Sequence, residues 1–129
     1  MNPLSPVPVL CVALGGALGS VARHALGVMA LRYLGAAFPW GTLTVNVAGS
    51  LVIGVIGGMM AAGTAVAPEL RLFLVTGILG GFTTFSSFSL DTGALFQRAP
   101  ALAALYLVTT ILGGLAAFAL GWWIGQRAA

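Results

Sequence analysis

Charge is what this sequence has least of. Five basic and two acidic side chains make only 5% of the 129 residues charged, whereas 60% are hydrophobic. A water-soluble domain carries about a quarter of its residues as charged side chains. The chain therefore has too little polar surface to cover a soluble core, and we expect lipid to be its solvent.

Reactive groups are equally scarce. The sequence has one cysteine, Cys11, which cannot form an internal disulfide, and one histidine, His24. With Glu69 and Asp91 as the only acids, it contains no metal-ligand cluster, catalytic triad or phosphate-binding loop, so we expect no enzymatic activity. The basic residues are arginines scattered singly, without the stripe that nucleic-acid binding requires, so nucleic acid is not an expected partner.

Long apolar runs are abundant. A helix needs about 20 apolar residues to cross the core of a bilayer. Prolines and short polar breaks separate four such runs, at Val7–Leu31, Gly41–Ala62, Leu70–Phe96 and Pro100–Gly125. We expect an all-α membrane protein with four transmembrane helices in a single domain over residues 1–129, whose first helix is retained and not cleaved as a signal peptide.

The arginines do not favour one orientation in the membrane. Arg71 and Arg127 would lie on one side of the four spans, and Arg32 and Arg98 on the other. Positive residues normally mark the cytoplasmic side, so this balance predicts insertion in both orientations. Two oppositely oriented copies can pair as inverted repeats do within one chain, which predicts an antiparallel, dual-topology homodimer.

The third apolar run is expected to break near its middle. Gly80 and Gly81 weaken a helix, and Thr83 and Thr84 follow them closely. Carbonyls freed by a break cannot face lipid, so they must face protein, water or an ion. Carbonyls from two such breaks would suit a hard cation. The alternative is a glycine kink that serves packing alone.

Aromatic and polar residues within the spans suggest a path for an anion. Phe82, Phe85 and Phe88 are spaced three apart and so fall near one face of a helix. Aromatic ring edges carry partial positive charge, and rings presented edge-on could hold a small anion. The alternative is that the three rings form a stripe facing the core or lipid.

The second and fourth spans carry hydrogen-bonding residues one turn apart. Asn46 has Thr42 one turn before it, and Tyr106 is followed by Thr110. Such residues rarely face lipid. They could donate hydrogen bonds along an anion path or act as glue between helices, and Tyr106 could alternatively lie at headgroup level as interfacial aromatic residues do.

Arg23 is a charge inside an apolar run. It must snorkel, pair or face water, and Asp91 is a possible partner. His24, beside it, is expected to be an interfacial or packed residue. Arg32 lies near a helix end, where it would attract anions to the mouth of a path.

Three motifs in order resemble one family. The run from Gly80 to Phe88 resembles the signature of the Fluc family of fluoride channels, also called CrcB proteins. The segments 15–23 and 40–49 are similar to further motifs of this family, and the resemblance covers nearly the whole chain. It implies passive, fluoride-selective export and fluoride resistance, by a dual-topology dimer with two antiparallel pores in a bacterial inner membrane.

The resemblance also assigns residues. Asn46 is similar to the pore amide, and Phe85 and Phe88 to the two rings that line the paths. Gly80 and Thr83 resemble the pair whose carbonyls hold a structural sodium ion at the dimer interface. The remaining implied positions are a polar track of Thr42, Tyr106 and Thr110, with Gly114 departing from a hydroxyl found in some members, and Asp91 where relatives also carry an acid.

Two other functions are compatible with four apolar helices. A small proton-coupled multidrug exporter needs a carboxylate embedded in the membrane, but here Glu69 lies in a loop and Asp91 near a helix end. A scaffold subunit that transports nothing is the third possibility, and it leaves the Asn, Phe and hydroxyl residues without a role.

Overall fold

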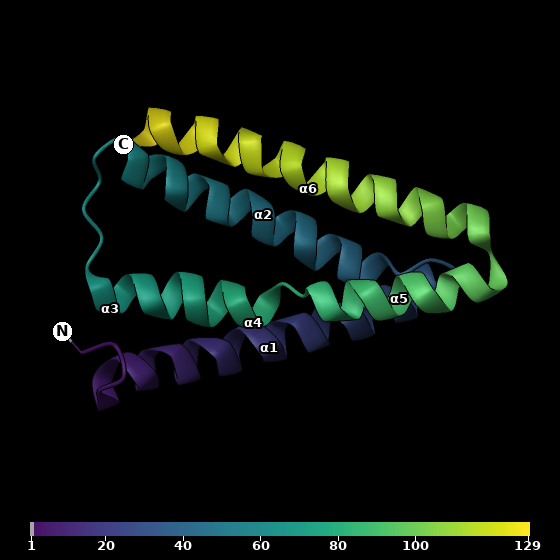
Figure 1. Ribbon diagram of the computed structural model, residues 1–129, viewed down its shortest axis with the longest axis horizontal. Helices are drawn as coiled ribbons and strands as arrows, with labels where there is room; N and C mark the ends of the chain where they lie inside the picture. Colours follow the sequence, from purple (N-terminus) through teal and green to yellow (C-terminus); the bar gives the residue numbers. More distant parts are fainter. Residues whose placement is uncertain (1) are drawn as a thin grey trace.

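The computed structural model describes residues 2–129, and its regular elements in that range are all helices, with no strand (Figure 1). Its elements are α1 (Pro6–Leu34), α2 (Trp40–Ala61), α3 (Pro68–Arg71), η1 (Leu72–Leu79), α4 (Gly80–Phe82), α5 (Phe85–Arg98) and α6 (Pro100–Ala128). They form four spans long and apolar enough to cross a membrane, the third being 68–98. The four predicted helices are confirmed, and their ends differ from the predicted ones by at most three residues.

Prolines mark where the spans begin. α1, α3 and α6 each have proline in their first turn, where its fixed φ suits a helix and its missing N–H costs no hydrogen bond. α1 ends at Gly35, whose φ of 82° is in the left-handed region that glycine adopts without strain.

Part of the third span was not predicted: η1 is a π-helix of eight residues, wound more loosely than an α-helix.

The spans pack as two close pairs. α2 lies along α6, and α1 lies along η1 and α4 (Figure 1). Glycines permit both approaches: a Cβ on Gly81 would lie 2.6 Å from the carbonyl oxygen of Gly16, and a Cβ on Gly121 would meet the backbone of Leu51. Small residues let helix backbones approach closely in lipid. These glycines therefore serve packing within one chain.

Few large side chains are buried in the single chain. The main buried cluster contains Phe88, Leu95, Ala103 and Tyr106, where α5 packs on α6. Large apolar side chains on every long span are exposed, as on Leu14, Val52, Leu90 and Leu112, the pattern of helices that face lipid or another membrane-embedded chain. Both chain ends lie at the same end of the bundle, as four crossings require (Figure 1).

Candidate functional site

Two extended residues separate α4 from α5. Thr83 has φ −86° and ψ 157°, and Thr84 has φ −154° and ψ 122°. Thr83 completes the helix before it, because its backbone N–H and its hydroxyl both donate to the carbonyl of Leu79 at 2.9 Å. Thr84 begins the helix after it, because its hydroxyl accepts the Ser87 N–H at 3.1 Å, as expected of an N-cap residue.

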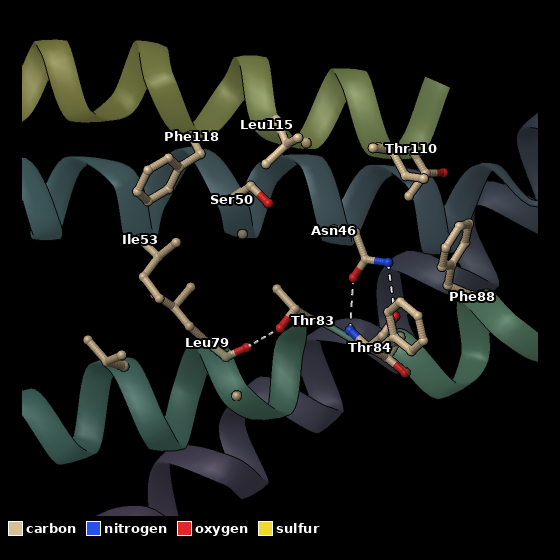
Figure 2. Close-up of a pocket in the computed structure, with 16 residues that line it drawn as sticks. Asn46, Ser50, Ile53, Leu79, Thr83, Thr84, Phe88, Thr110, Leu115 and Phe118 are labelled. Carbon is tan, nitrogen blue, oxygen red and sulfur yellow. Dashed lines mark hydrogen bonds between the residues drawn. The ribbon is translucent and has the colours of Figure 1, made fainter. Parts of the chain in front are cut away.

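Asn46 of α2 connects to this interruption through two hydrogen bonds. Its side-chain nitrogen donates to the Thr84 carbonyl at 2.9 Å, and its side-chain oxygen accepts the Thr84 N–H at 2.8 Å (Figure 2). An amide nitrogen carries two hydrogens, and within residues 2–129 the second has no partner. Asn46 therefore acts as a brace and retains one donor.

The carbonyls of Gly80 and Thr83 lack the partners that a continuous helix would supply. Those partners would be the N–H groups of Thr84 and Ser87. The Thr84 N–H donates to Asn46, and the Ser87 N–H donates to the Thr84 hydroxyl. The two carbonyl oxygens are therefore left for water, another chain or a cation.

A cavity of about 540 Å³ lies between α2, η1, the interruption, α5 and α6 (Figure 2). No charged side chain lines it within the described part of the chain. Six predicted site residues do line it: Asn46, Gly80, Thr83, Phe85, Phe88 and Thr110. The structure thus brings the predicted amide, both rings and both sodium-site residues to one cavity.

Thr110 contributes a buried hydroxyl. The residue is 9% exposed, and its side-chain oxygen has no hydrogen-bond partner within residues 2–129. A buried polar group without a partner is costly. Because Thr110 lines the cavity, its hydroxyl can donate a hydrogen bond to water or to a ligand there.

The two phenylalanines of α5 differ in exposure. Phe85 is 78% exposed and Phe88 is 6% exposed, and their rings meet edge to face with centroids 5.7 Å apart. Phe82 does not continue their face: it precedes the extended residues, packs near Gly49 and is absent from the cavity wall. The three rings therefore do not share one helix face as their spacing predicted, because two extended residues interrupt the helix between Phe82 and Phe85.

Thr42 and Tyr106 belong to a second polar group, centred on Asp91. The Thr42 hydroxyl donates to one Asp91 carboxylate oxygen at 2.6 Å, and the Tyr106 hydroxyl donates to the same oxygen at 3.3 Å. Tyr106 is fully buried within the chain, so its ring does not face lipid. The predicted track is divided: Thr110 lines the large cavity, whereas Thr42 and Asp91 line a separate cavity of about 300 Å³.

Arg23 does not pair with Asp91, and that possibility is corrected. Its Nε donates to the Gly81 carbonyl at 3.0 Å, because α1 lies beside α4, whereas Asp91 accepts its hydrogen bonds from α2 and α6. Arg23 and the exposed His24 line a third cavity of about 480 Å³. Arg32 is exposed in the last turn of α1.

Arg98 has a role that the sequence did not suggest. One of its terminal nitrogens donates to the carbonyls of Ala36 at 3.1 Å and Ala37 at 2.9 Å, in the loop between α1 and α2. From the sequence, Arg98 entered only the count of arginines on each side of the membrane. Its position at a helix end, two residues before Pro100, suggests a contact with a neighbouring loop, but the sequence does not show which backbone carbonyls would accept its hydrogen bonds.

Comparison with known proteins identifies the family. Residues 10–122 match the family model of the CrcB-like protein, Camphor Resistance (CrcB). A protein of Agrobacterium fabrum named fluoride-specific ion channel FluC is 48% identical, over 94% of this chain and 98% of its own length. Proteins of the same name from Rhizobium etli and Rhodospirillum centenum are 51% and 55% identical, over 89% and 77% of this chain and 93% and 79% of their own lengths. The family predicted from the three motifs is confirmed: the chain belongs to the CrcB-like family.

Proposed function

We propose that the protein is a fluoride channel that lets fluoride leave the cell passively. The observation that carries this proposal is the cavity wall, which offers uncharged donors and no charged side chain. Asn46 has a spare amide hydrogen, Thr110 has an unpartnered buried hydroxyl, and Phe85 and Phe88 supply ring edges. The relatives named fluoride-specific ion channels support the same function.

This donor set suits fluoride on physical grounds. Fluoride is small and strongly hydrated, so a path must replace part of its water with dipoles of its own. A full positive charge in the wall would hold the anion too long, whereas amide, hydroxyl and ring-edge donors attract it without trapping it. A narrow path of this kind also disfavours the larger chloride ion.

The exporter alternative receives no support from the geometry. Proton-coupled export of a cation needs a carboxylate in the substrate cavity. Asp91 does not line the large cavity, and its carboxylate accepts hydrogen bonds from Thr42 and Tyr106. A scaffold role leaves the unpartnered hydroxyl of Thr110 without a purpose.

Ion flux from liposomes tests the proposed function. Purified protein should release fluoride rapidly, chloride far more slowly and a cationic drug not at all, because only fluoride matches the donors in the cavity. Protein-free liposomes are the control. Equal release of fluoride and chloride, or proton-driven uptake of the drug, would contradict the proposal.

The channel is proposed to work as an antiparallel homodimer. Phe85 lines the cavity yet is 78% exposed, so a second copy is needed to enclose the path. The balance of Arg71 and Arg127 against Arg32 and Arg98 supports both orientations. Reporters fused to the C-terminus should therefore be found on both sides of the membrane, and a reporter on one side alone would exclude dual topology.

A structural sodium ion is proposed between the two subunits. The Gly80 and Thr83 carbonyls lack helical partners and belong to residues that line the cavity, and carbonyl oxygens are ligands that hard cations accept. Two subunits would supply four such oxygens.

We also propose that two arginines of α1, Arg23 and Arg32, attract anions toward the pore mouths.

Removal of sodium should weaken the dimer. An ion that binds only the folded assembly stabilises it by mass action, so replacing sodium with a large organic cation, with time for exchange, should lower the temperature at which the dimer dissociates. Size-exclusion chromatography after heating measures this, with potassium as a second cation. Unchanged dimer stability and unchanged fluoride flux would show that the interruption holds no cation.

A further inference from the structure

The loop between α1 and α2 carries an aromatic side chain into the buried cluster. Phe38 packs against the cluster that contains Phe88 and Tyr106. Its ring meets the Tyr106 ring edge to face, with centroids 5.5 Å apart and planes at 84°. No helix holds Phe38, because the loop occupies residues 35–39.

Tyr106 connects Phe38 to the rings of the proposed pore. On its other side its ring meets Phe88 at a centroid distance of 5.1 Å, and Phe88 in turn meets Phe85 at 5.7 Å. Tyr106 is fully buried, and its hydroxyl donates to Asp91. Four rings therefore touch in sequence from the loop to the cavity, with Tyr106 packed between Phe38 and Phe88.

Arg98 fixes the loop that carries Phe38. Its guanidinium donates to the two carbonyls directly before Phe38, those of Ala36 and Ala37. Arg98 closes α5, the helix that begins with Phe85 and contains Phe88. The same helix thus presents the pore rings at one end and holds the supporting loop at the other.

We propose that Phe38 is a positioning residue for the Phe88 ring, acting through Tyr106, and that Arg98 holds the loop in place for it. The proposal rests on the proposed function, because it assigns Phe88 to a fluoride path. Edge-to-face contacts are directional. Without the Phe38 ring behind it, Tyr106 can tilt, and the edge that Phe88 presents to the cavity moves.

Fluoride flux with a matched control tests the role of Phe38. Phe38→Leu removes the ring and should lower fluoride efflux about threefold to tenfold, the range expected when an aromatic pair is lost. Leu43→Ala also removes three carbon atoms beside the same cluster but no aromatic ring, so it should lower dimer stability and leave flux per folded dimer within about twofold.

A double substitution separates positioning from general packing. If Phe38 acts through Tyr106, Phe38→Leu should cause no further loss of flux in a Tyr106→Leu background, because the intermediate ring is gone. Independent losses that multiply would overturn the proposal. Equal loss of flux from Phe38→Leu and Leu43→Ala would overturn it as well, since it would indicate a shared packing defect.

Amide hydrogen exchange tests Arg98 without depending on fluoride. Flux is counted per folded antiparallel dimer, because removing either arginine also alters the charge balance that supports both orientations. Arg98→Gln should increase exchange across residues 35–41 and lower this flux about threefold, whereas Arg127→Gln should change neither, because the Arg127 guanidinium lies over the Trp123 ring. Unchanged exchange in Arg98→Gln would overturn the role of Arg98. If liposomes with wild-type protein release no fluoride, the proposed function is contradicted, and the exchange measurement still tests whether Arg98 holds the loop in place. If Phe38→Leu does not fold, the flux of Arg98→Gln decides the proposal.

Discussion

Replacing Asn46 with aspartate is expected to abolish fluoride efflux. The carboxylate has no hydrogen to donate to the cavity or to the Thr84 carbonyl, which accepts from Asn46 at 2.9 Å. It also places a negative charge in a wall that has none. Two like charges about 4 Å apart repel by about 4 kcal/mol at an effective dielectric constant of about 20, enough to lower the rate about a thousandfold. Efflux from liposomes measures it.

A second variant is needed because Asn46 also braces the interruption. Ser50 lies one turn along α2 and lines the same cavity, but it makes no bond to Thr84. Ser50→Asp should therefore also reduce efflux strongly while leaving the Asn46 brace intact. Wild-type efflux from well-folded Asn46→Asp protein would contradict the proposed pore. Loss of efflux together with loss of the dimer would favour a packing role for Asn46.

Replacing Phe88 with isoleucine is expected to lower fluoride efflux about tenfold or more. Isoleucine keeps apolar bulk but removes the ring edges that meet Phe85 and Tyr106 and that border the cavity. Phe85→Ile should have a similar effect on efflux with less effect on folding, because Phe85 is far more exposed in the single chain. Efflux is measured per folded dimer.

Phe96→Ile provides the matched control for the ring variants. Phe96 lies on the same helix as Phe88, is 60% exposed and lines none of the three cavities. The same substitution there should leave efflux unchanged. An equal loss of efflux in Phe96→Ile, or a loss in Phe88→Ile that only follows the yield of dimer, would show that ring edges do not contribute to conduction.

The four spans could be predicted because lipid imposes a simple requirement. A span needs a long apolar run, and proline and glycine mark where it starts or stops, so the predicted ends lie close to those of α1 and α6. The π-helical winding of η1 could not be predicted, since it is a shift of backbone hydrogen bonds with no composition of its own. The extended residues lie at Thr83 and Thr84, after the glycine pair, because Thr84 can cap the helix that follows.

The sequence predicts which site residues share a face of one helix, but not which neighbouring helix that face contacts. Spacing places Asn46 one turn from Thr42, but it does not say which helix that face meets. The structure turns Thr42 toward Asp91 and Asn46 toward Thr84. The partner of Arg23 depended in the same way on how α1 crosses α4, and it proved to be the Gly81 carbonyl. Contacts between helices follow from crossing geometry, which a single sequence does not encode locally.

The loose winding of η1 determines which way the residues after it face around the axis of the third span. A residue in an α-helix turns the chain by about 100°, and a π-helix turns it by less. Over Leu72–Leu79 the third span therefore rotates less about its axis than an α-helix of the same length would. With this rotation, Gly81 packs against α1 and Gly80 lines the cavity. If the same eight residues were wound as an α-helix, Gly80 and Gly81 would arrive on other faces of the span, although every side chain of the cavity wall would remain in the sequence.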